Sequence, residues 1–176
     1  MPPRSFRGFR SLAAFAVLAS SLSVAGGASA QSVRLLGDFR DWSAYATSDD
    51  AGQLCFAMTK PKQIEPQPDG FTEAYLYLTN RPAEGVRNEL NLVAGYQFSP
   101  DTGAALTVGS HTYTLFTDTD AAWLEDVSQS ENLAGFIRAG SSLWIEGTTE
   151  RGIKIKQVFS LSGATAASRA IDAACS

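Results

Sequence analysis

Residues 73–79 read Glu-Ala-Tyr-Leu-Tyr-Leu-Thr, and their side chains alternate between two chemical types. Successive side chains of a β-strand point to opposite faces of a sheet, so alternation over this length predicts a half-buried strand. The small and aliphatic residues are expected to face a core, and the aromatic and hydroxyl residues to lie on the other face. The first set is Ala74, Leu76 and Leu78, and the second is Tyr75, Tyr77 and Thr79.

Similar short apolar segments, separated by turn residues, occur along most of the chain. Gly109-Ser110 predicts one hairpin, and residues 147–152 predict another. Three prolines make residues 60–70 a predicted loop without a regular hydrogen-bond ladder, and Gly95 is a predicted bulge or point of close approach. The predicted strands are 42–46, 54–58, 73–79, 89–98, 105–108, 113–116, 143–146 and 153–161, with further turns at 48–52 and 80–85.

Two helices are predicted among these strands. Ser128 stands three residues before Glu131, which is the spacing of a capping box, and an apolar stripe then runs to Gly140. The alanine-rich residues 164–175 predict a C-terminal helix whose apolar face includes Cys175. About eight short strands with two helices predict a mainly β fold, a single-domain β-sandwich or barrel-like structure whose last short helix is C-terminal.

The first thirty residues differ from the rest of the chain. Three arginines form a basic segment without an acidic residue, residues 12–24 are apolar or small, and an Ala-Ser-Ala motif ends at Ala30. This order is typical of a secretory signal peptide, and an N-terminal amphipathic or membrane-anchoring helix is the alternative. We predict a signal peptide over residues 1–30, cleavage between Ala30 and Gln31, and one domain over residues 31–176.

Composition limits the classes of partner. Hydrophobic residues make up 44% of the chain and charged residues 18%, which is enough apolar material for a packed core. The first thirty residues hold three of the 14 Lys and Arg and none of the 18 Asp and Glu, so residues 31–176 carry a net charge of −7. This acidic balance argues against nucleic acid as the main partner. No segment after residue 30 is apolar and long enough to predict a transmembrane helix.

Cys55 and Cys175 are the only cysteines. An even number of cysteines in an exported chain favours disulfides, and two cysteines allow only one intramolecular pairing. We therefore predict a Cys55–Cys175 disulfide that links the last helix to the sheet. Two buried free thiols and an intermolecular disulfide are the alternatives. A structural zinc site needs four ligands, and the cysteines and the single histidine are scattered along the chain.

Catalytic motifs are missing from the sequence. His111, the sole histidine, lies beside a predicted turn, no serine occupies a nucleophile-elbow motif, and no glycine-rich phosphate loop is present. We therefore predict no catalytic residues, no metal and no cofactor. Two alternatives stay open: an irregular calcium site, and a carboxylate pair brought together from distant segments for glycoside hydrolysis. The acids available to the calcium site are Asp118, Asp120, Glu125 and Asp126.

Four groups of residues carry a family resemblance. They are 41–45 with Cys55; 79–86 with 88–89 and 93–96; 115–117 with 122–123; and 140–142 with 151–152, 159–163 and 171–175. In this order and spacing they resemble the invasion-associated locus B family of exported alphaproteobacterial proteins. The resemblance spans about residues 37–175, nearly the whole of residues 31–176, although residues 153–157, Ile-Lys-Ile-Lys-Gln, depart from the Ser/Thr- and Asp-rich strand of relatives.

The resemblance implies a periplasmic or secreted protein of the cell envelope, with association with the outer membrane as an open alternative. It links some pathogenic relatives to host-cell invasion, and it implies no catalytic residues. Most of the motif residues are also expected to be determinants of the fold. In particular, Trp42 and Trp123 are large aromatic residues that a small β domain is expected to bury.

Two functions remain as hypotheses. The first is a non-catalytic module that binds an envelope or host protein through its surface, and it predicts an exposed patch at Tyr75 and Tyr77. The second is a secreted hydrolase with an unrecognised carboxylate-based site, and it predicts a deep polar pocket with convergent carboxylates. The sequence leaves the partner and the oligomeric state open.

Overall fold

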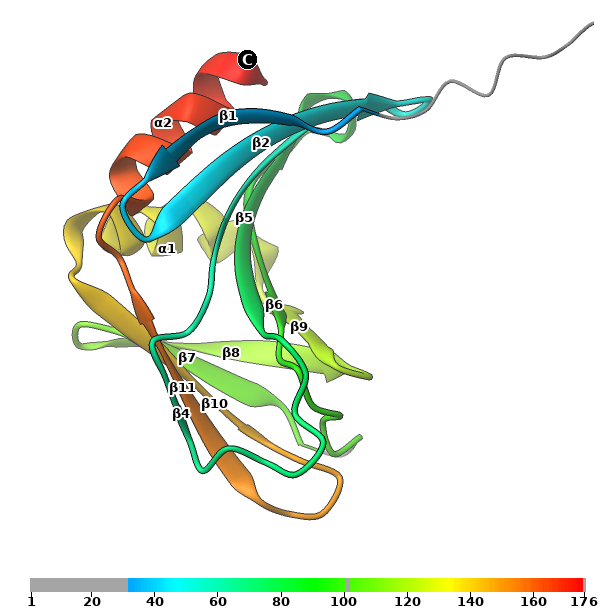
Figure 1. Ribbon diagram of the computed structural model, residues 1–176, viewed down its shortest axis with the longest axis vertical. Helices are drawn as coiled ribbons and strands as arrows, with labels where there is room; N and C mark the ends of the chain where they lie inside the picture. The colour runs from blue at the N-terminus through cyan, green and yellow to red at the C-terminus, as the bar shows by residue number, and fades with distance from the viewer. Residues whose placement is uncertain (1–31, 101, 176) are drawn as a thin grey trace, which may run out of the picture. The chain divides into compact units, whose positions relative to one another are not determined.

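The computed structural model describes residues 32–100 and 102–175, which form one antiparallel sheet and two α-helices (Figure 1). The strands are β1 (Arg34–Phe39), β2 (Trp42–Asp49), β3 (Gly52–Thr59), β4 (Gln63–Glu65), β5 (Tyr75–Arg81), β6 (Val86–Val93), β7 (Ala104–Val108), β8 (His111–Asp118), β9 (Ala121–Leu124), β10 (Ser142–Thr148) and β11 (Lys154–Ser160). The helices are α1 (Ser130–Ala139) and α2 (Ala164–Ala174), with short 3-10 helices η1 (Pro82–Glu84) and η2 (Val127–Gln129).

The strands follow the order β1-β2-β3-β5-β6-β9-β8-β7-β10-β11-β4 across the sheet. Figure 1 shows that the sheet bends strongly, with α1 and α2 together on one side of it. The predicted mainly β class with two helices, the last one C-terminal, is confirmed. The strands form a single open sheet that does not close into a barrel. The predicted cleavage site between Ala30 and Gln31 lies outside the described residues.

The alternating segment forms β5, between β3 and β6. Leu76 and Leu78 are buried, and Leu78 pairs with Ala57 of β3 and Leu90 of β6, which are buried as well. The same face of the three strands therefore supplies one continuous part of the core. Both predicted hairpins are present, as β7–β8 and β10–β11.

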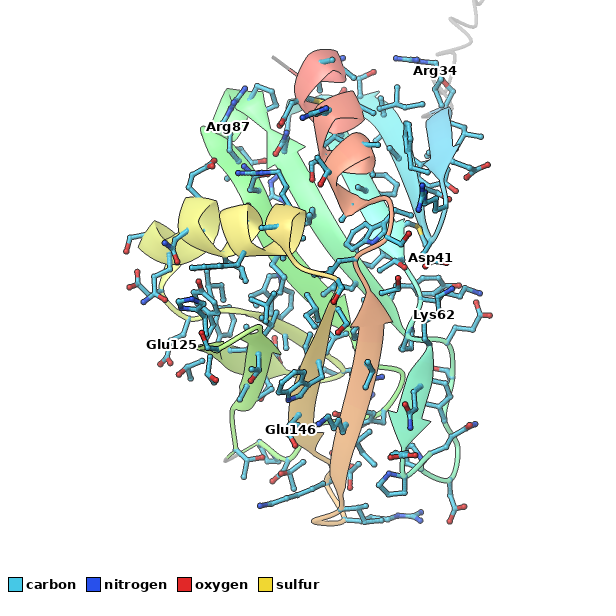
Figure 2. All side chains as sticks on the ribbon, turned by 90° about the vertical axis from the view of Figure 1, so that its left-hand side faces the viewer. Arg34, Asp41, Lys62, Arg87, Glu125 and Glu146 are labelled. Atoms are coloured by element: carbon cyan, nitrogen blue, oxygen red, sulfur yellow. A yellow bond between two sulfur atoms is a disulfide. The ribbon has the colours of Figure 1, made fainter. Side chains whose placement is uncertain are left out.

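Strands β1, β4 and β9 have no counterpart in the sequence prediction. Residues 60–70 were predicted to lack a ladder, but Gln63–Glu65 pairs with β11 at the end of the sheet. An edge strand needs hydrogen bonds on one side only, and Pro66 ends this one after three residues. Figure 2 labels Asp41 and Lys62, whose ion pair of 2.6 Å joins the β1–β2 turn to the segment just before β4.

The predicted strand over residues 89–98 both begins and ends earlier, as Val86–Val93. Gly95 lies beyond its end with φ +77°, so it is not a bulge within the strand. A Cβ at Gly95 would lie 2.7 Å from the Phe71 ring and 3.0 Å from the Thr72 carbonyl oxygen. The predicted close approach is therefore confirmed, because only glycine fits there.

The expected capping box at Ser128 and Glu131 is wrong. A 3-10 turn precedes α1, and the Asp126 carboxylate accepts hydrogen bonds from the Ser128 backbone N–H (3.0 Å) and hydroxyl (2.6 Å). Hydrogen bonds from Ser128, and then from Gln129, hold the pKa of Asp126 below its usual value. Glu131 instead accepts a 2.7 Å hydrogen bond from the Asn88 side chain.

Helix α2 covers the inner face of β1, β2, β3 and β5. Its residues Ala164, Ala167 and Ile171 are buried, and the following Cys175 forms a disulfide with Cys55 of β3 across a Cα–Cα distance of 5.9 Å. The Asn80 side chain donates a 2.8 Å hydrogen bond to Asp172 of the same helix. The C-terminal helix is thus held by apolar packing, one covalent bond and one part-buried polar contact.

Candidate functional site

The side of the sheet opposite α2 carries a row of half-buried aromatic side chains on β2, β3 and β5. Tyr45 stacks on Phe56 with ring centroids 5.2 Å apart. Phe56 meets Tyr77 edge-on at 6.0 Å, and Tyr77 lies 6.1 Å from Tyr75. We call these four residues the aromatic ladder. Cross-strand pairing fixes their order, because Tyr45 is opposite Phe56 in the β2–β3 register and the two tyrosines lie two residues apart on β5.

Charged side chains border one end of the aromatic ladder. The Lys60 ammonium lies 2.7 Å from the Glu73 carboxylate and 5.1 Å from the centroid of the Tyr75 ring. The Tyr75 hydroxyl also donates a hydrogen bond to Glu73. The hydrogen bond from Lys60, followed by the one from Tyr75, lowers the pKa of Glu73, and the bond to Glu73 raises the pKa of Lys60. Tyr75 is therefore held between a cation on its ring and a carboxylate on its hydroxyl.

The aromatic surface continues across the next strands. Tyr77 is opposite Asn91 of β6, Asn91 is opposite Trp123 of β9, and Trp123 is opposite Phe116 of β8. Phe116 and Trp123 stack with centroids 5.3 Å apart and ring planes 17° apart. Trp42 is buried as expected, but the expectation that Trp123 is buried in the core is wrong, because it is half-buried on this outer face.

A hollow of about 320 Å³ opens beside Phe116 and Trp123, and we call it the Phe116 hollow. Phe116 is 48% exposed and Val127 is 74% exposed, which is unusual for large apolar side chains. The hollow is bounded by apolar residues from β6, β8, β9 and η2 and by two carboxylates. Its lining consists of Glu89, Leu90, Phe116, Asp118, Trp123, Leu124, Val127 and Ser130.

A second hollow, of about 370 Å³, lies among the loops that follow β4, β6 and β10, and we call it the loop hollow. Its lining includes the carboxylates Asp69, Asp120 and Glu150 together with Arg151, whose guanidinium lies 3.8 Å from Asp69. A wider hollow of about 730 Å³, over β7, β10 and β11, is lined by both acidic and basic side chains. Lys156 of β11, within the segment that departs from the family pattern, lies 4.5 Å over the Trp144 ring.

The candidate catalytic and calcium-binding residues are dispersed. His111 is exposed at the start of β8, and its ring stacks on Phe136 of α1 with centroids 3.7 Å apart. Asp118 and Asp120 lie in the β8–β9 hairpin, whereas Asp126 caps η2. Among residues 32–100 and 102–175, no group of three or more His, Cys, Asp or Glu side chains is arranged to hold a metal ion. In that part of the chain no helix has the length and apolar character required to cross a membrane.

The fold and the outer face together define a small single-sheet β protein with a disulfide-linked C-terminal helix and an aromatic surface. No known family model matches the sequence, and no curated protein matches it either. Among solved structures, invasion associated protein B from Bartonella henselae is similar, with a TM-score of 0.57 and 15% sequence identity. The match covers 78% of this chain and 96% of that chain. At this identity the comparison shows a shared fold, and the protein that shares it bears the name of the family that the sequence motifs resemble.

Proposed function

We propose that this chain is an exported, non-catalytic protein of the cell envelope that binds another protein through the outer face of its sheet. The aromatic ladder carries the proposal. Aromatic side chains are enriched in protein interfaces because each one buries a large area while losing little rotamer freedom. Here the stacking of Tyr45 on Phe56 and the packing of Phe56 against Tyr77 hold the rings in place before any partner arrives.

Independent observations support the proposed location and the proposed kind of partner. The N-terminal segment has the order of a signal peptide, the disulfide requires an oxidising compartment to form, and the similar protein from Bartonella henselae is an invasion associated protein. These support a periplasmic or secreted protein that meets an envelope or host protein.

We expect the protein recovered from its own organism to begin at Gln31. The basic segment and the Ala-Ser-Ala motif ending at Ala30 direct cleavage to that bond. N-terminal sequencing of the protein from the envelope fraction, with the cytosol and the medium analysed in parallel, tests this. A chain that keeps Met1, or that is recovered in the cytosol, would contradict export.

The double variant Phe56→Thr/Tyr77→Thr should lose its envelope or host partner, with affinity reduced at least roughly tenfold, because central aromatic residues dominate interface energies. Threonine keeps the strand preference, so the sheet should persist. The measurement is cross-linking capture from the native envelope, compared with wild type. His111→Ala is the matched control, because it removes an exposed ring at the start of β8, outside the aromatic ladder. Capture that survives the double variant would contradict this role of the face.

The loop hollow favours the hydrolase as a second candidate, because Asp69, Asp120 and Glu150 all line it. In that reading two of the carboxylates serve as acid and base on a substrate held in the hollow. Asp120→Asn separates the two functions. Loss of a deletion strain's complementation by Asp120→Asn, with export and melting temperature unchanged, favours the hydrolase. Full complementation by Asp120→Asn, together with loss of complementation by the Phe56→Thr/Tyr77→Thr double variant (the ladder variant), favours the binding module.

A further inference from the structure

The Phe116 hollow combines exposed apolar surface with negative charge. Phe116 and Val127 are two of the five large hydrophobic side chains that the described residues expose. Glu89 and Asp118 stand beside them in the lining, to which the described residues contribute no lysine, arginine or histidine. Figure 2 shows Glu125, a further carboxylate, on the segment between β9 and α1. The surroundings of the hollow therefore favour a ligand that is both apolar and positively charged.

The carboxylates differ in how far they are already engaged. Glu89 accepts a 2.8 Å hydrogen bond from Arg81, whose guanidinium also contacts Glu84 at 3.0 Å. Among the described residues, the Asp118 side chain accepts one hydrogen bond, of 3.1 Å from the hydroxyl of its neighbour Thr119, and Asp118 lies on an exposed part of β8. Asp118 thus retains capacity for a charged donor, since an ionised carboxylate offers about four acceptor positions.

At two other places on this chain an aromatic ring, a cation and a carboxylate lie together. Lys60 lies over the Tyr75 ring and contacts Glu73. Lys156 of β11 lies over the Trp144 ring of β10 and is opposite Glu146 in the β10–β11 register. Each arrangement places a cation within about 6 Å of an aromatic centroid, where the ring quadrupole attracts it. At Phe116 and Trp123 the stacked rings and the carboxylate are present, but the described residues supply no cation over them.

We propose that the Phe116 hollow binds an arginine side chain from a basic segment of the protein partner. The stem of that side chain packs on Val127, its planar guanidinium stacks on the free face of Phe116, and its N–H groups donate to the Asp118 carboxylate. Arginine suits the site better than lysine because its planar fork can stack and donate two hydrogen bonds at once. The net charge of −7 on residues 31–176 attracts such a segment from a distance.

This inference rests on the proposed binding function and adds the chemistry of the partner. The probe is a synthetic peptide with three arginines separated by glycines, and the control peptide replaces each arginine by citrulline, which keeps the shape and removes the charge. We expect the arginine peptide to shift the Trp123 indole resonance in NMR titrations of the full domain. The citrulline peptide should leave that resonance unchanged. About 0.5 M salt should weaken binding of the arginine peptide, because exposed charges are screened.

Two single variants locate the site. Phe116→Thr and Asp118→Asn should each lower the affinity for the arginine peptide roughly threefold to tenfold, since they remove the stacked ring and the charged acceptor respectively. Glu146→Gln is the matched control, because it removes a carboxylate from the same side of the sheet, on β10, and binding should not change. Both variants lie at exposed positions, so the melting temperature should stay close to wild type.

The outcomes separate this inference from the proposed function. The arginine site is overturned if the citrulline peptide binds as well as the arginine peptide. It is also overturned if Phe116→Thr and Asp118→Asn leave binding of the arginine peptide unchanged. Both results hold even if the ladder variant still loses its native partner. Loss of the peptide with native capture intact in Phe116→Thr also overturns the arginine site, because the hollow would then not meet the partner. If sedimentation reveals concentration-dependent dimers of the wild-type protein and Phe116→Thr abolishes these dimers, the hollow binds a second copy of this chain, and the arginine site is overturned.

Discussion

Replacing both Cys55 and Cys175 with serine is expected to lower the free energy of unfolding by up to about 5 kcal/mol. The two cysteines are 120 residues apart in the sequence, so the bond closes a very long loop of the unfolded chain. Breaking it gives the unfolded chain more conformational freedom, which shifts the equilibrium away from the folded state. A loss of this size is a large part of the free energy of unfolding of a small domain, so the melting temperature should fall clearly.

The loss should be felt first at α2. Without the disulfide, this helix is held by the packing of Ala164, Ala167 and Ile171 and by the hydrogen bond between Asn80 and Asp172. Hydrogen exchange should therefore accelerate in residues 164–175 before it does in the β5–β6 pair. A parallel Cys→Ala pair separates the effect of the lost bond from that of burying two serine hydroxyls, because both positions are fully buried. Two free thiols in protein purified from its own organism, detected by mass spectrometry, would contradict the bond itself.

The elements that the sequence predicted well are those whose pattern is local. Strand β5 and both hairpins follow from alternation and turn residues, and the buried face of α2 follows from the helical spacing of its alanines and Ile171. Strand β1 reads Arg-Leu-Leu-Gly-Asp-Phe and β9 only Ala-Ala-Trp-Leu, and neither alternates enough to be recognised. These strands exist because a neighbouring strand supplies their hydrogen bonds, which is a tertiary effect.

The candidate site was visible only in part for the same reason. Alternation predicted that Tyr75 and Tyr77 lie opposite Leu76 and Leu78, and it could not reveal which side chains lie beside them. Tyr45 and Phe56 join the tyrosines through the register of β2, β3 and β5, which depends on hydrogen bonding between strands. Trp123 was misplaced in the core because burial is the commonest fate of a tryptophan in a small domain, whereas its position on β9, opposite Phe116, directs it outward.

Gly163 marks a contact on which the docking of α2 depends. It precedes the helix with φ +99°, and a Cβ built on it would lie 1.7 Å from the Phe39 carbonyl oxygen at the end of β1. Nearby, the Asp41 N–H donates a 3.2 Å hydrogen bond to the Ser162 carbonyl, so the β1–β2 turn and the start of α2 are in direct backbone contact. The glycine is therefore required both for its conformation and for the space that it leaves.

We expect Gly163→Ala to lower the free energy of unfolding by roughly 3–5 kcal/mol, because the left-handed conformation and the forced separation of two backbone segments both cost energy. Gly85→Ala is the matched control: its φ is +69° and nothing lies within 4 Å of the added Cβ, so it should lose only about 1 kcal/mol. Urea denaturation of both variants, with the disulfide intact, measures the difference. Equal losses would show that conformation alone makes glycine necessary at position 163. A much larger loss for Gly163→Ala, accompanied by faster hydrogen exchange in α2 and β1, would show that the close contact with Phe39 seats the C-terminal helix on the sheet.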